Sequence, residues 1–142
     1  MKFKVLLSTS FLALSFNLLA FNVTGDSFKS KFEITSITVG ADHSTINATS
    51  AAAGQYGKVY LSYTLTSNDT ARNQGTFEGH GRGISPEGDL AAGVLKGVWT
   101  RDGKVISIKS LDDVTDGVNY MQGEIDLISG EINIEVLSLI HI

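Results

Sequence analysis

Residues 94–111 read VLKGVWTRDGKVISIKSL, and this stretch decides the fold class. Two runs rich in apolar residues, 94–100 and 105–111, flank the dipeptide Asp102-Gly103. Asp-Gly supplies the positive backbone dihedrals that a two-residue β-hairpin turn requires. The stretch therefore predicts two antiparallel strands joined by a tight turn.

The same pattern extends in both directions along the chain. Apolar side chains recur at every second position in most runs, and none of the runs carries a sustained helical stripe. Further turn signals stand at Pro86-Glu87-Gly88, Asp116-Gly117 and Ser129-Gly130, about a dozen residues apart. Strands are predicted at 31–39, 57–66, 74–83, 90–101, 104–112, 118–128 and 131–136. Segment 40–56, rich in Gly, Ala, Ser and Thr, is interpreted as a mobile loop, a short helix or a flap.

Chain length and strand rhythm together predict one domain over residues 21–136. The expected fold is all-β: a single antiparallel β-barrel of about seven or eight strands in meander order. It is expected to follow an N-terminal signal peptide. Lys2 and Lys4 precede an apolar run that ends near Ala20, which is the pattern of a cleaved export signal over residues 1–20. We therefore expect a secreted or periplasmic protein, with a retained anchor as the alternative.

Charge and composition narrow the range of partners. The chain carries a net charge of −4, and removing residues 1–20 takes away two lysines and no acid, which leaves −6. An acidic domain repels phosphate groups, so neither nucleic acid nor, after signal cleavage, a membrane surface is an expected partner. The absence of cysteine excludes disulfides and thiolate metal sites. No cofactor is expected, and the oligomeric state is left open.

The last six residues, Leu137 to Ile142, have two interpretations. They correspond to one reading frame of a common transposon-type sequencing adapter, and on that hypothesis residues 137–142 are an artefact. The alternative is a genuine apolar end of the last strand. His141 lies in this segment and is therefore not a candidate site residue.

The most informative segment for function is GTFEGHGRG, residues 75–83. In a strand, Glu78, His80 and Arg82 share one face, and Phe77 shares the other with alternate glycines. Phe77 is the large apolar side chain of the segment, so its face is expected to point into the barrel. The glycines would then leave space for a neighbouring aromatic ring or a ligand. The candidate pocket residues are Phe77, Gly79, Gly81, Trp99 and Tyr63. Tyr60 and Tyr120 are further candidates to line or cover it.

An alternative site uses the polar face of the same strand. If Glu78, His80 and Arg82 pointed into the barrel, they could orient a ligand or move a proton. The other interpretation of these three residues is a solvated outer face.

Metal and catalytic patterns are weak elsewhere. Asp112, Asp113 and Asp116 lack the spacing of a calcium loop and are interpreted as a turn-forming acidic loop. His43 and His80 would need distant carboxylates to complete a zinc site, so no metal is expected. Catalytic residues cannot be assigned from the sequence, because it holds neither a nucleophile elbow nor a phosphate-binding loop.

The glycine strand, the preceding run 59–66 and Gly97-Val98-Trp99 together resemble the small secreted β-barrels related to allene oxide cyclase and the calycins. The resemblance covers about residues 57–112 and implies a barrel with a largely apolar cavity. The function expected first is binding of a small apolar or aromatic ligand, without catalysis. The alternatives are a cyclase or isomerase that acts by positioning its substrate, and a structural or interaction protein without a pocket.

Overall fold

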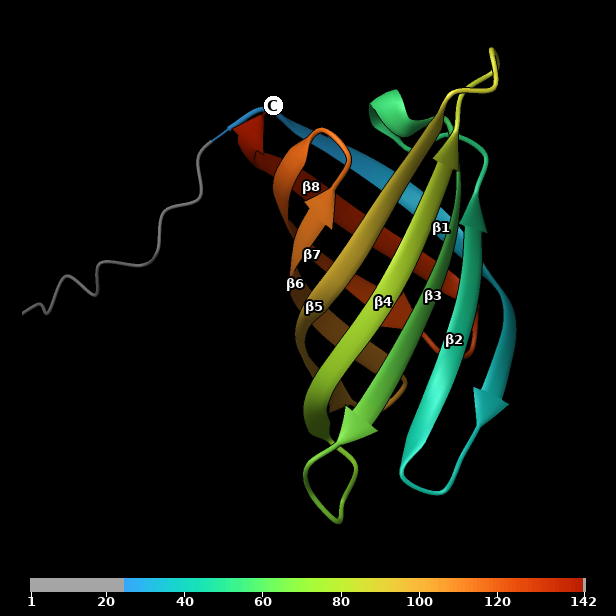
Figure 1. Ribbon diagram of the computed structural model, residues 1–142. Coiled ribbons are helices and arrows are strands. Elements are labelled where there is room, and N and C mark those ends of the chain that lie inside the picture. The colour runs from blue at the N-terminus through green and yellow to red at the C-terminus, as the bar shows by residue number, and fades with distance from the viewer. Residues whose placement is uncertain (1–24, 142) are drawn as a thin grey trace, which may run out of the picture.

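The computed structural model describes residues 25–141 and shows a closed, all-β barrel (Figure 1). Its eight strands run antiparallel in simple chain order, and β1 pairs with β8 to close the ring. The strands are β1 Ser27–Val39, β2 His43–Ser50, β3 Lys58–Ser67, β4 Gln74–Ile84, β5 Leu90–Asp102, β6 Val105–Val114, β7 Gly117–Asp126 and β8 Glu131–His141. The meander barrel predicted from the hairpin pattern is confirmed.

Short turns connect the strands of the carboxy-terminal half. Gly103 has φ of 58° and Gly130 has φ of 77°, both in the left-handed region that glycine adopts without steric cost. Both glycines lie at predicted hairpins, between β5 and β6 and between β7 and β8. The turn residues therefore determine where the chain reverses.

The interpretation of residues 40–56 as a loop or flap is wrong for most of the segment. Residues 43–50 form strand β2, and only Gly54–Tyr56 form a short 3-10 helix, η1. Strand β2 pairs along its whole length with β3, and Ile46 and Ala48 point into the core. The alternation was hard to recognise because Ser, Thr and Asn fill most other positions of β2.

The meander gives the barrel two distinct ends (Figure 1). One end carries η1, the β4–β5 hairpin and the β6–β7 turn, and we call it the η1 end. The opposite end carries the β1–β2, β3–β4, β5–β6 and β7–β8 connections.

Strand alternation separates a buried interior from an exposed exterior. Along β4, every second residue from Gly75 to Gly83 is buried, and the residues between them are exposed. Phe77 therefore points into the barrel, as predicted from its apolar character. The largest fully buried side chains are Tyr63, Phe32, Ile108, Met121, Ile125 and Ile132.

Glycines on the inner face provide space for large side chains on the adjacent strands. Gly79 pairs with Tyr63 of β3, and a Cβ atom at Gly79 would lie 2.7 Å from the tyrosine ring. Gly97 pairs with Phe77, and a Cβ atom there would lie 2.8 Å from the phenylalanine ring. Covering a strand glycine with a cross-strand aromatic ring is a known way to stabilise a curved sheet. Most of the glycine space is therefore filled by the protein itself.

The described residues include the carboxy-terminal segment up to residue 141 but not the first 24 residues. The predicted signal peptide, residues 1–20, lies outside the described residues. Residues 137–141, interpreted above as adapter-derived, continue β8 and pair with β7, and Leu137 also faces Ser27 of β1. Within residues 25–141, no helix has the length and apolar character needed to cross a membrane.

Candidate functional site

A cavity of about 80 Å³ lies inside the barrel toward the η1 end. This volume is several times what one water molecule needs and suits a molecule of about the size of a single aromatic ring. Its walls are mainly apolar and come from most of the strands. Prominent wall residues are Phe32, Leu61, Leu95, Met121, Ile134 and Val136.

One wall of the cavity contains a buried carboxyl group, that of Asp112 on β6. Ile106, Ile108, Ser110 and Asp112 occupy alternate positions of β6, so all four point inward. Only 5% of the Asp112 surface is exposed. The Ser110 hydroxyl donates a hydrogen bond of 2.5 Å to Oδ1 of Asp112. Burial outweighs that hydrogen bond and raises the pKa of Asp112 from 3.8 to about 6.

Tyr63 of β3 lies in the same cavity wall, and its side chain is 1% exposed. Within the described residues, its hydroxyl is fully buried and has no hydrogen-bond partner. Burial raises the pKa of Tyr63, and the nearby charge of Asp112 raises it further. An unpaired buried hydroxyl is costly, so it needs an explanation such as a bound ligand.

A hydrogen-bonded group of side chains closes the η1 end of the cavity. The Tyr56 hydroxyl donates to Asp116 of the β6–β7 turn at 3.0 Å and accepts from Asn119 of β7 at 3.0 Å. Gln55 also donates to Asp116, and the Tyr56 ring packs against Phe28 with centroids 6.1 Å apart. These contacts attach η1 to the opposite side of the barrel. Tyr56, Phe28 and Asn119 therefore form the cap of the cavity.

The structure brings together only part of the predicted pocket. Tyr63 and Gly81 both line the cavity. Phe77 packs edge-on against Tyr63 with ring centroids 5.4 Å apart, and the Tyr63 ring covers Gly79. Trp99 lies toward the opposite end, where its indole N–H donates to the carbonyl oxygens of Thr66 and Thr76. Phe77, Gly79 and Trp99 thus belong to the packed core that supports the cavity.

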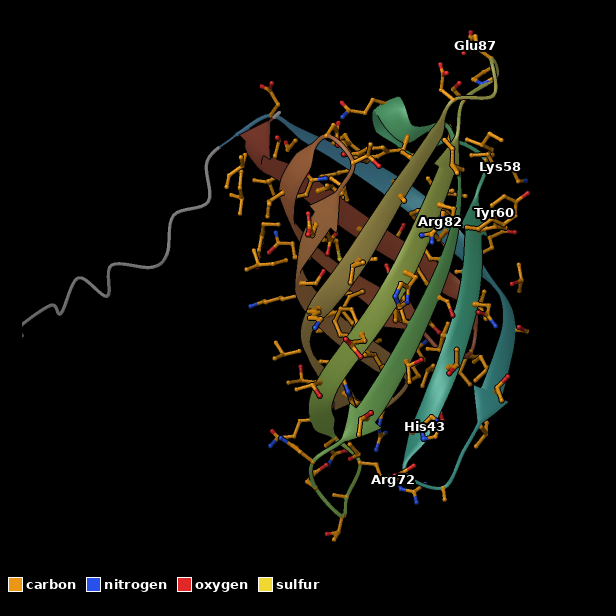
Figure 2. All side chains as sticks on the ribbon, viewed as in Figure 1. His43, Lys58, Tyr60, Arg72, Arg82 and Glu87 are labelled. Atoms are coloured by element: carbon orange, nitrogen blue, oxygen red, sulfur yellow. The ribbon has the colours of Figure 1, made fainter. Side chains whose placement is uncertain are left out.

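The residues of the alternative polar site belong to the exposed set of β4, although Arg82 also borders the cavity. Glu78, His80 and Arg82 are exposed on β4, and Glu78 pairs with Lys96 at 3.2 Å on the outer surface. The Arg82 guanidinium folds back and donates to the carbonyl oxygen of Gly81 at 2.8 Å. Figure 2 shows Arg82 and Tyr60 on the outer face. The expectation that Tyr60 lines or covers the pocket is wrong, because Tyr60 belongs to the outward set of β3 residues and is 54% exposed.

The interpretation of Asp112 as part of a turn-forming loop is also wrong. Both Asp112 and Asp113 belong to strand β6, and only Asp116 lies in the turn. A signal was present in the sequence: Asp112 continues the inward alternation of Ile106 and Ile108 by two further steps. An acidic residue in phase with an apolar face indicates a buried carboxyl group. Within residues 25–141, no three His, Cys, Asp or Glu side chains gather closely enough to hold a metal ion.

The fold and the cavity together define an eight-stranded antiparallel β-barrel with an internal, partly polar pocket. Comparison with protein families, with curated proteins and with solved structures finds no match to this chain.

The unpaired hydroxyl leads to a prediction about stability. Replacing Tyr63 with phenylalanine should raise the free energy of unfolding by about 1 kcal/mol or more, because it removes a buried group without a partner. Urea denaturation of the purified variants measures this change. The matched control is Tyr56→Phe, which loses two hydrogen bonds of 3.0 Å and should be destabilised by about 1 kcal/mol. A loss of stability in Tyr63→Phe would mean that the hydroxyl is paired in solution.

Proposed function

We propose that this protein is an exported barrel that binds a small, largely apolar molecule in the cavity at its η1 end. The observation that carries the proposal is the combination of apolar walls with the unpaired Tyr63 hydroxyl and the buried Asp112 carboxyl. Ligand pockets are typically apolar with a few polar groups that fix orientation. Burying a hydroxyl and a carboxyl group costs free energy, so two such groups are not expected in the wall of a cavity that has no ligand.

Export and the family resemblance are both predictions from the sequence. Export rests on the pattern of residues 1–20, and an apolar cavity is what the resemblance to the allene oxide cyclase-like and calycin-like barrels implies. That family assignment stays a prediction, because no comparison bears on it. The proposal itself depends on the described residues around the cavity.

A catalytic function is the second candidate, and one observation favours it. The Asp112 carboxyl has a pKa of about 6 and shares the cavity with the Tyr63 phenol. A buried carboxyl group of this kind can exchange a proton with a bound substrate near neutral pH. Ligand extracted from the wild type and from Asp112→Asn distinguishes the two functions by chromatography. An isomerase would accumulate a different isomer in the variant, whereas a binding protein would not.

Filling the cavity should abolish binding of an apolar probe. Gly81 lines the cavity, and a Cβ atom there would meet first the flexible end of Leu61 at 3.0 Å, with Leu95 and the Tyr60 carbonyl oxygen both at 3.9 Å. Gly81→Leu should therefore project into the cavity and displace toluene. We expect toluene to bind the wild type, as measured by changes in the amide NMR spectrum, and to lose at least about tenfold in affinity in Gly81→Leu.

His80→Ala is the matched control, because it alters the neighbouring residue on the outer face of the same strand. It should leave toluene binding unchanged. Thermal unfolding identifies a variant that fails to fold, and Gly93→Val provides a second filling variant, since Gly93 also lines the cavity. Binding that survives Gly81→Leu and is lost in His80→Ala would place the site on the outer polar face.

A further inference from the structure

The barrel interior contains a carboxylate with no cation beside it. Among the described residues, the buried polar side chains other than Asp112 are Ser30, Ser50, Ser110 and Asn119, all of them neutral. Each ion pair found in residues 25–141 lies on the surface and involves other acids. A buried carboxylate normally has a cationic partner, because its desolvation is otherwise uncompensated.

The elements packed around Asp112 do not supply that partner. Leu95 faces it from β5 and Asn119 faces it from β7. Tyr63 of β3 and Tyr56 of η1 line the same cavity, and both are neutral phenols. Arg82 also borders the cavity, but it is an exposed residue of β4 and its guanidinium donates to the Gly81 carbonyl oxygen at 2.8 Å. Asp116 at the rim is itself an acid and accepts from Tyr56.

We infer that the ligand of this cavity is a small apolar amine whose ammonium group pairs with Asp112. The inference rests on the proposed binding function and names the chemical class of its ligand. An ammonium group brings three N–H donors and no acceptor. Asp112, Tyr63 and Asn119 all line the cavity, and each of their side chains carries an oxygen atom that can accept a hydrogen bond. The apolar part of the ligand would contact Leu61, Met121 and Val136.

The surroundings of the η1 end also favour a cation. The connections at this end carry Glu87, Asp89 and Asp116. Figure 2 shows Glu87 on the β4–β5 hairpin, with Lys58 and Arg82 as basic residues near this end. Acids grouped at this end of the barrel raise the local concentration of cations and lower that of anions. An anionic ligand would therefore meet repulsion at the η1 end and again at Asp112.

Three probes of nearly equal size test the charge of the ligand: benzylamine, benzyl alcohol and benzoate. At about pH 7.5 the amine is a cation and Asp112 is ionised. Isothermal titration calorimetry on the full-length mature protein should show benzylamine binding at least about tenfold more tightly than benzyl alcohol. Benzoate should bind more weakly than the alcohol.

The Asp112→Asn variant should lose this preference. Benzylamine affinity should fall to about that of benzyl alcohol, whose own affinity should change little. The variant removes a buried charge, so it should remain folded. Asp113→Asn is the matched control: it removes an adjacent carboxylate with the same change in net charge, but from the outer face of β6. It should retain the preference for the amine.

Proton linkage gives an independent readout. Asp112 has a pKa of about 6, and a bound ammonium group favours its ionised form. Benzylamine binding near pH 6 should therefore release a fraction of a proton, whereas benzyl alcohol binding should not. Calorimetry in two buffers of different ionisation enthalpy measures this release. At about pH 5, where Asp112 is mostly protonated, the preference for the amine should shrink.

The outcomes separate this inference from the proposed function. If benzyl alcohol binds as tightly as benzylamine and Gly81→Leu removes both, the cavity binds apolar molecules and the amine inference is overturned. Preference for benzoate, or a preference for the amine that survives in Asp112→Asn, overturns it as well. If neither toluene nor any of the three probes binds, the proposed function fails together with the inference.

Discussion

Replacing Trp99 with alanine is expected to lower the free energy of unfolding by about 3–5 kcal/mol. The indole is 6% exposed and packs against the inner face at the end of the barrel opposite η1. Its N–H donates to the carbonyl oxygens of Thr66 at 3.2 Å and Thr76 at 3.1 Å, which ties β3 and β4 to β5. The substitution removes apolar contacts, leaves a cavity and loses these hydrogen bonds. Chemical denaturation monitored by circular dichroism measures the loss, since the variant has no other tryptophan.

Trp99→Phe separates the contribution of the indole N–H from that of the buried aromatic ring. Phenylalanine keeps a buried aromatic ring and loses the donor, so it should cost about 1–3 kcal/mol. Benzyl alcohol binding by either folded variant should match the wild type, because Trp99 does not line the η1-end cavity. A loss below about 1 kcal/mol in Trp99→Ala would contradict the role of the indole as a core residue.

The stability of the wild type should fall as the pH rises from about 4 to about 6. Burial raises the pKa of Asp112 from 3.8 to about 6, so the folded state binds a proton more tightly than the unfolded state. Between these two values the folded state holds more protons, and the free energy of unfolding therefore decreases with increasing pH. A shift of about two pKa units corresponds to about 3 kcal/mol. Above about pH 6 this contribution is fully lost and the curve should level off.

Asp112→Asn should lack this dependence. The difference in free energy of unfolding, variant minus wild type, should be about 3 kcal/mol larger at about pH 7.5 than at about pH 4. Urea denaturation of both proteins at the two pH values gives the difference. Asp113→Asn serves as the control, since the exposed Asp113 side chain is solvated in both states. Parallel pH profiles for the wild type and Asp112→Asn would show that Asp112 is ionised without penalty in the fold.

Part of the site could be predicted from alternation alone. Phe77 was assigned to the interior because it is the large apolar side chain of its strand, and the alternate glycines followed by period two. The same reasoning extended along β6 would have placed Asp112 inside, in phase with Ile106 and Ile108. An acidic run beside Asp116-Gly117 has the composition of a turn, and this composition masks the alternation at Asp112. The serines and threonines of β2 mask its two inward apolar residues in the same way.

The sequence pattern alone is enough to predict the strands of residues 25–141 other than β2, several of the turns between them and the two faces of most strands. These are local properties: a pleated backbone sends successive side chains to opposite faces, and Asp-Gly favours one kind of turn. Only the tertiary structure decided that Tyr63 and Asp112 share a cavity. Their strands, β3 and β6, are not neighbours, and closure of the ring between β1 and β8 brings their inner faces together. The tertiary structure also decided where space remains, because the Tyr63 ring covers Gly79 whereas a Cβ atom at Gly81 would meet first the flexible end of Leu61, at 3.0 Å, in the cavity wall. Which glycine is covered depends on the register between β3 and β4 and on how each side chain packs, and neither can be read from one strand alone.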